Sequence, residues 1–404
     1  MTASWLTPRR IRAHALLLAI CLWTVYAIDM STPGLRDRNG LIKGTDFLHF
    51  YTLGNIALQK RGDLLYNIKA QATLLQKLVP EAAGNVYVPL YGPQVSLLFA
   101  PFARMSYPTA LTVWLLLNAV IYGACGYLVW KQCSNLRGEP WTVLVAALAF
   151  PGFFHLILWG QTSGLALLCF TLAFLALSED RPYLAGIAIG SLIFKPQLGL
   201  APAIIFLFAR EWKVIATAIL AALAQLSVGW LGWLFYGTPV TSEYLRSLRH
   251  VGDVMALLEP RPYQMHSLRA FWSLLIPWTP PAFALYALTA ATILALAVRC
   301  WRSTATLGLR YSALMLATVL VAPHLTVYDL LILAPAFLLM ADWAVGGAER
   351  SAAMMSVLLY LCYPLFLLGP LARITHLQLS VIAMTGLLFL IDRDRKMSSN
   401  PYIT

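Results

Sequence analysis

Apolar segments of helical length recur along the whole chain, and short polar turns separate most of them. A helix needs about 20 apolar residues to cross a bilayer, and fewer where it is broken. The chain therefore predicts an all-α polytopic membrane protein, a single integral domain over residues 1–404. About twelve spans are expected, at residues 13–29, 107–130, 141–157, 162–178, 183–194, 197–209, 214–235, 279–298, 308–322, 328–341, 352–369 and 377–391.

Two longer and more polar stretches interrupt this series, at residues 30–106 and 236–278. The first loop belongs to residues 1–235, the half in which we expect the chemistry, and the second opens the half 236–404. Four apolar residues of the first loop fall near one helical face and predict a helix lying on the membrane surface: Phe47, Phe50, Tyr51 and Leu58. Gly62 is its expected stop. A second helix is expected at 67–79, and a re-entrant or interfacial helix before Pro101.

Composition narrows the class of protein. Hydrophobic residues make up 60% of the chain and charged residues 11%, which is more apolar surface than a soluble protein of this length can bury. The net charge of +12 comes from cations at segment ends, where they anchor spans, so no nucleic-acid partner is expected. The six cysteines have neither CxxC nor metal-finger spacing and are interpreted as packing residues. No small-residue cleavage site closes the first apolar run, which is therefore expected to be an uncleaved span.

The cations also predict an orientation. With the amino terminus in the cytoplasm, the cytoplasmic turns hold Lys131, Arg181, Arg210, Arg299 and Arg350, whereas the short outer turns hold few cations. Both long loops then lie outside, in a plasma membrane of bacterial type.

Polar side chains from separate segments gather on this outer side, where ionisable groups at membrane depth are costly and are functional candidates. They are Asp46, His49 and Tyr91 of the first loop, Gly160-Gln161, Lys195-Pro196-Gln197, Arg261 and His266 of the second loop, and His324, Tyr328 and Asp329. Asp46 is the leading candidate for a general base, because a carboxylate can take the proton of an attacking hydroxyl. Its alternative role is to cap a helix, which Thr45 could also do.

The other candidates have equally simple alternatives. Lys195 could pair with a phosphate or anchor a span by snorkelling. His324 and Asp329 could orient a sugar or form an interhelical hydrogen bond. Arg261 and His266 could be solvated loop residues. Dinucleotide-binding and Walker loops are absent from the sequence, which argues against a nucleotide-sugar donor held in a soluble domain.

Taken together, these phrases resemble glycosyltransferase family 87, the polyprenol-phosphate-mannose-dependent mannosyltransferases of GT-C type. They follow the family's order over about residues 40–340. The matching phrases are Thr45-Asp46-Phe47 with Tyr51, Leu65-Tyr66, Tyr87-x-Pro89-Leu90, Ala100-Pro101, Trp114, Gly160-Gln161, Gly186-x-x-x-Gly190 leading to Lys195-Pro196-Gln197, and His324 with Tyr328-Asp329-Leu330.

The resemblance implies a GT-C fold whose long first extracytoplasmic loop carries interfacial helices. It implies an inverting transfer of a hexose, mannose first, from a polyprenyl-phosphate donor to a lipid-linked or glycan acceptor, with Asp46 as the base. Lys195, Arg261, His266 and His324 would meet the donor, together with Gln161, Gln197, Tyr328 and Asp329. His49 and Tyr91 are expected near the acceptor. His49 departs from the family's pattern, because an aromatic residue is common at its position, and the resemblance therefore does not identify the acceptor. No second acidic residue stands near Asp46 at ligand spacing, so neither a metal nor another cofactor is expected.

Two other functions fit a polytopic chain. A lipid or polysaccharide transporter often shows repeated halves with broken helices at corresponding positions. Here the breaks lie in one half, and the first outer loop has no counterpart later. A non-catalytic subunit of an envelope-polymer complex is the remaining alternative.

Overall fold

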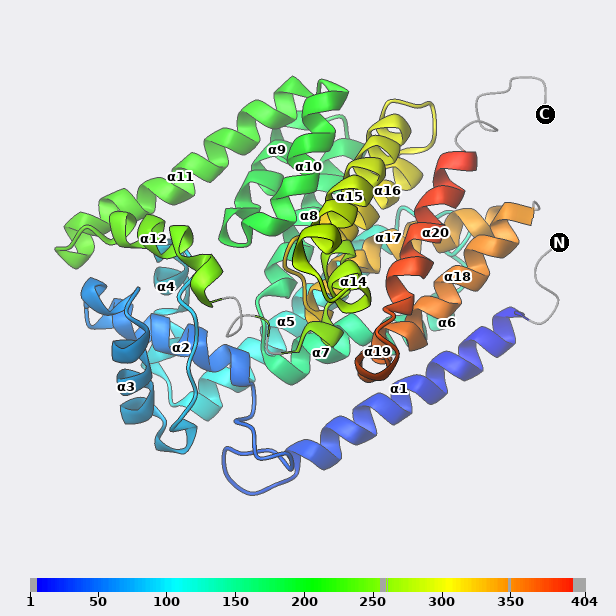
Figure 1. The fold of residues 1–404 in the computed structure, drawn as a ribbon. Helices are drawn as coiled ribbons and strands as arrows, with labels where there is room; N and C mark the ends of the chain where they lie inside the picture. Colours follow the sequence, from blue (N-terminus) through cyan, green and yellow to red (C-terminus); the bar gives the residue numbers. More distant parts are fainter. Residues whose placement is uncertain (1–5, 255–258, 260, 348–349, 395–404) are drawn as a thin grey trace.

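The computed structural model describes residues 6–254, 259, 261–347 and 350–394, and every regular element in these ranges is helical (Figure 1). Extended backbone pairs there only in two isolated bridges, Arg36 with Ile42 and Met265 with Thr326. The expected all-α class is therefore confirmed for the described part of the chain.

Five described helices are long and apolar enough to cross a membrane: α1 (Pro8–Met30), α5 (Tyr107–Trp130), α15 (Thr279–Trp301), η7 (Val327–Leu333) running into α17 (Ala334–Gly346), and α18 (Arg350–Leu367). The number is seven if each of two bent pairs counts as one span: α6 (Pro140–Leu148) with α7 (Pro151–Trp159), bent by 45°, and α19 (Gly369–Thr375) with α20 (Leu379–Asp394), bent by 108°. The other apolar helices are α8 (Ser163–Ser178), α9 (Pro182–Gly190) with η4 (Ser191–Phe194), α10 (Pro196–Ala209), α11 (Trp212–Tyr236) and α16 (Leu307–Val321). Each of the twelve expected segments falls on one helix or on two consecutive helices of this multi-pass membrane protein.

Prolines set where the short helices begin. Pro140, Pro151, Pro182 and Pro196 are the first residues of α6, α7, α9 and α10. A first-turn N–H has no partner within its helix, so a proline there costs no hydrogen bond. The chain breaks just before Pro196, and Lys195 therefore lies at the junction between η4 and α10 rather than within a helix.

The first loop folds into α2 (Thr45–Leu58), α3 (Ile68–Leu78) and α4 (Pro93–Phe99), with the short turns η1 (Gly62–Leu64), η2 (Pro80–Ala82) and η3 (Phe102–Arg104). The expectation that α2 lies on the membrane surface is wrong, because every residue from Phe47 to Ala57 is buried. Helices α3 and α4 and the start of α5 pack around α2 and cover the face that a surface helix would expose. α2 is therefore the core helix of the loop.

Gly62 does not end α2, which stops four residues earlier at Leu58. A Cβ on Gly62 would lie 2.5 Å from Thr238 Oγ1 and 2.7 Å from Val240 Cγ1. The glycine is therefore needed for close approach between the two long loops. The second loop contains α12 (Val240–Arg249), η5 (Val251–Val254), η6 (Pro262–Gln264) and α14 (Leu268–Leu275).

Helix α9 packs directly on α11 through two glycines. A side chain on Gly186 would overlap the carbonyl of Val214, and one on Gly190 would overlap the carbonyl of Ala218. Small residues one turn apart let helix backbones approach closely in a membrane. This contact fixes α9 and η4, and with them the junction that carries Lys195.

Candidate active site

Two glycines bring the beginning of α2 against the end of α7. Gly44 precedes α2 with φ +66°, and Gly160 follows α7 with φ +69°. Glycine adopts this left-handed conformation without steric cost. A Cβ on Gly160 would lie 2.8 Å from the Cβ of Phe47 and 3.6 Å from the Cα of Gly44. The Trp114 indole donates to the Gly160 carbonyl at 2.9 Å and holds this contact in place.

The residues that follow these glycines meet. Gln161 donates from Nε2 to Oδ2 of Asp46 at 3.0 Å, and its own oxygen accepts from the backbone N–H of Thr162 at 2.9 Å. The Gln161 amide is thus held with its donor toward the carboxylate. Asp46 and Thr45 do not cap α2, because Gly44 is its capping residue and no side-chain cap bond forms.

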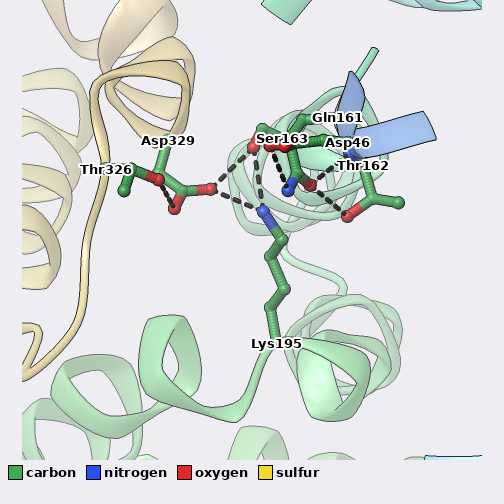
Figure 2. Close-up of polar contacts among 7 residues, drawn as sticks. All are labelled: Asp46, Gln161, Thr162, Ser163, Lys195, Thr326 and Asp329. Atoms are coloured by element: carbon green, nitrogen blue, oxygen red, sulfur yellow. Dashed lines mark hydrogen bonds and ion pairs between the residues drawn. The ribbon is translucent and has the colours of Figure 1, made fainter. Parts of the chain in front are cut away.

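A buried ion pair lies beside Asp46 (Figure 2). Lys195 Nζ is 2.7 Å from Oδ1 of Asp329 and donates to Ser163 Oγ at 3.0 Å, and Ser163 donates to the same carboxylate oxygen at 2.6 Å. Thr326 donates to the other oxygen at 3.5 Å. Lys195 and Asp329 are each 2% exposed. Lys195 therefore neither snorkels to the surface nor offers an uncompensated charge.

The charges of this pair reach Asp46. Burial raises the pKa of Asp46 to about 6, while the Gln161 hydrogen bond and the charge of Lys195 lower it and the charge of Asp329 raises it. Burial also raises the pKa of Tyr91, on which Lys195, Asp329 and Asp46 all act. Tyr91 therefore belongs to the same cluster, as does Tyr328, whose ring centroid lies 5.1 Å from Lys195 Nζ.

His49 lies one turn along α2 from Asp46 and is buried among aromatic rings. Its ring centroid is 5.1 Å from that of Tyr87 and 5.8 Å from that of Tyr91. Burial lowers its pKa to about 4, and neither ring nitrogen has a hydrogen-bond partner among the described residues. His49 is therefore a neutral wall residue of the cluster, next to Tyr91.

Arg261 is the predicted cation that stays exposed. Its guanidinium carbon lies 5.8 Å from the ring centroid of Trp159, which stands two residues before Gln161. The arginine therefore lies over the end of α7, close to the segment that bonds Asp46. The exposure of Arg261 agrees with the alternative that it is a solvated loop residue. Its contact with the Trp159 ring explains why it lies over the end of α7.

Two predicted histidines have other partners. His324 Nδ1 lies 3.1 Å from an oxygen of Glu259, which also pairs with Arg269. His266 is buried, and its Nδ1 lies 2.7 Å from Ser380 Oγ. His324 is therefore not the hydrogen-bond partner of Asp329. Gln197 is half-buried two residues beyond Lys195.

Sequence reasoning missed Ser163, Thr162 and Glu259. Thr162 and Ser163 belong to the polar run Gln161-Thr162-Ser163, which separates two apolar segments. This run is the sequence feature that could have identified them. Glu259 is a lone acid in a long loop, and nothing in the sequence links it to His324. Within the described ranges, no three side chains of the His, Cys, Asp and Glu types converge as metal ligands would.

Replacing Gly160 with alanine is expected to lower both stability and activity. The left-handed backbone costs a non-glycine residue about 1–3 kcal/mol, and the new Cβ presses on Phe47 at the start of α2. The Asp46–Gln161 bond then lengthens. Gly34→Ala is the matched control, because Gly34 has φ +78° but open space around it. Thermal unfolding should show a loss in both variants and turnover a loss only in Gly160→Ala. Equal turnover in the two would show that the close approach does not position Asp46.

The profile of glycosyltransferase family 87 matches residues 90–323, which is more than half of the chain. The matched region contains Gln161, Lys195 and Arg261. It begins downstream of Asp46 and ends just before His324. No curated protein and no solved structure matches the chain. The chain belongs to glycosyltransferase family 87.

Proposed function

We propose that this membrane glycosyltransferase moves a hexose, mannose first, from a polyprenyl-phosphate donor to a hydroxyl of a lipid-linked or glycan acceptor. One observation carries the proposal. Asp46 has one oxygen held by Gln161, and its Oδ1 has no hydrogen bond among the described residues. Both oxygens of the neighbouring Asp329 are engaged. Of the two carboxylates, Asp46 is thus the one with an oxygen available to a substrate.

The reaction that suits this arrangement is a single displacement with inversion. The acceptor hydroxyl oxygen attacks the anomeric carbon, and the bond from that carbon to the phosphate oxygen breaks. The hydroxyl proton passes to Asp46, and polyprenyl phosphate leaves with the bonding electrons. A glycosyl phosphate already carries a good leaving group, so one base with electrostatic stabilisation of the phosphate suffices.

The phosphate needs a cation that is not already neutralised. Lys195 is bonded to Asp329, so its charge is compensated where it lies. Arg261 is exposed and rests on Trp159, beside the segment that bonds Asp46. A guanidinium binds phosphate through two parallel hydrogen bonds. We therefore assign the phosphate contact to Arg261 and a positioning role to Lys195.

The apolar helices support the proposed fold, and the basic turns support the proposed orientation. The seven longer and five shorter apolar helices together would form a GT-C fold of about twelve spans. The cluster lies at the end of α7 and the beginnings of α8 and α10, whereas Arg210 follows the end of α10. With the basic turns in the cytoplasm, Asp46 faces the extracytoplasmic side. A lipid-linked donor can reach it there from within the bilayer.

The pH dependence of turnover should report Asp46. With a pKa of about 6, the carboxylate is ionised above that pH, so activity should be full there and fall about tenfold per pH unit below it. Gln161 lowers this pKa, so Gln161→Ala should move the acidic limb of the kcat/KM profile to higher pH. Gln132→Ala, an exposed glutamine in a basic turn, is the control. If the acidic limb of Gln161→Ala lies at the same pH as that of wild type, the limb does not report the ionisation of Asp46.

The donor class is tested with the full chain in proteoliposomes containing a membrane lipid extract. Labelled mannose is supplied either as polyprenyl-phosphate-mannose or as a nucleotide-linked sugar. We expect a lipid-extractable glycosylated product from the first donor alone. Transfer from the nucleotide sugar would contradict the proposal. Movement of the labelled donor across the bilayer without a new glycosidic product would favour a transporter instead.

A further inference from the structure

A groove of about 690 Å³ opens between α10 and α15, which lie against each other in the fold (Figure 1). Its volume falls within the range of about 300–1,000 Å³ that is usual for small-molecule sites. Ile204 and Phe208 form the wall on α10. Ala291 and Ala295 lie one turn apart on α15, and both are exposed. Their small side chains leave the space that larger residues would fill.

One end of this groove is cationic. Arg299 and Arg302 line it at the end of α15. Arg299 donates from Nε and Nη2 to the two carboxylate oxygens of Asp392, and its side chain remains 51% exposed. Arg302 is exposed and has no side-chain partner in the described part of the chain. The groove is therefore apolar along its length and carries an uncompensated positive charge at its end.

The groove lies at the opposite end of the helices from Asp46. Helix α10 begins next to Lys195 and reaches the groove at Ile204 and Phe208. At 1.5 Å per residue, Phe208 lies about 20 Å along the axis from Lys195. A phosphate held by Arg302 is therefore too far from Asp46 to be the reacting donor. With the basic turns in the cytoplasm, this end faces the cytoplasmic leaflet.

We propose that the groove between α10 and α15 binds one anionic phospholipid of the cytoplasmic leaflet. Its phosphate contacts Arg302 and the exposed side of Arg299, and an acyl chain lies along Ala291, Ala295 and Phe208. Basic pockets between membrane helices on the cytoplasmic side bind anionic headgroups, and that leaflet holds anionic lipids. A zwitterionic lipid would match the apolar wall but not the charge.

The test is lipid retention by the purified full chain, measured by native mass spectrometry after incubation with phosphatidylglycerol or phosphatidylcholine. We expect preferential retention of phosphatidylglycerol. Arg302→Gln should weaken it about fivefold, because one cation near a headgroup contributes about that factor. Ala295→Trp should weaken it further, because the indole obstructs the groove where the acyl chain lies. Arg181→Gln, an exposed arginine outside the groove, should leave it unchanged.

Three results would overturn the proposal. Equal retention of the two lipids would indicate ordinary annular lipid. Phosphatidylglycerol retention that survives both Arg302→Gln and Ala295→Trp would place the lipid elsewhere. Displacement of phosphatidylglycerol from wild type by polyprenyl phosphate, but not by phosphatidylcholine, would make the groove a site for the isoprenoid carrier. Should Ala295→Trp fail to fold, phosphatidylglycerol retention that survives Arg302→Gln would by itself place the lipid elsewhere.

Discussion

Asp46→Asn is expected to lower the turnover of sugar transfer by about 10²- to 10⁴-fold, the usual contribution of a general base. The amide keeps the shape of the carboxylate and still offers an oxygen to Gln161, so the contact between α2 and α7 should persist. It cannot take the proton of the acceptor hydroxyl. The measurement is the initial rate of glycosylated lipid formation from polyprenyl-phosphate-mannose, at equal amounts of protein in proteoliposomes.

The matched control is Asp63→Asn, which neutralises an exposed carboxylate of the same loop. Asp63 pairs with Arg61 on the surface, and its loss should leave the rate unchanged. Because Asp46 acts in the transition state, kcat should fall while the KM for the donor stays close to that of wild type. An Asn variant with wild-type kcat would remove Asp46 from the mechanism. A raised donor KM with unchanged kcat would make Asp46 a binding residue.

The helices could be predicted from the sequence because lipid imposes a simple rule. A spanning segment must be apolar over its length and must satisfy its own backbone, so the expected segments fall on helices, although only five to seven candidates have the length of a span. The same rule does not apply to the first outer loop. The apolar face of α2 correctly predicted a helix. Its burial could not be predicted, because it results from packing against α3, α4 and the start of α5. Tertiary packing of this kind leaves no periodic signal in α2 itself.

Four side chains of the candidate site could be named from the sequence, but Thr162 and Ser163 were missed and the pairings could not be predicted. Asp46, Gln161, Lys195 and Asp329 stand out as polar groups at the ends of apolar segments. Lys195 and Asp329 are 134 residues apart, and nothing local shows that they bond each other rather than a substrate. Glu259 similarly takes His324 as its partner. Topology predicts which groups share a side of the membrane, whereas side-chain geometry decides which of them remain available.

Breaking the buried pair should destabilise the protein strongly. Lys195→Met leaves the Asp329 carboxylate buried without its cation, and Asp329→Leu leaves a buried ammonium. Each single change is expected to lower the free energy of unfolding by about 3–5 kcal/mol. The pair joins the beginning of α8, the junction before α10 and η7, so these three segments should loosen together. Thermal unfolding in detergent measures the loss, with the exposed Lys69→Met on α3 as control.

The double variant Lys195→Met/Asp329→Leu separates the two roles of Lys195. Replacing a buried ion pair by apolar side chains often leaves the free energy of unfolding unchanged. Most of the stability lost in the single variants should therefore return in the double variant. A deficit of about 1–3 kcal/mol should remain, because the Ser163 hydroxyl loses both of its partners. The two charges shift the pKa of Asp46 in opposite directions, so removing both should largely preserve its ionisation. If Lys195 only positions the cluster, donor KM should also recover, whereas Arg261→Gln should raise it. A double variant that regains stability but keeps a raised donor KM would assign the phosphate to Lys195 after all.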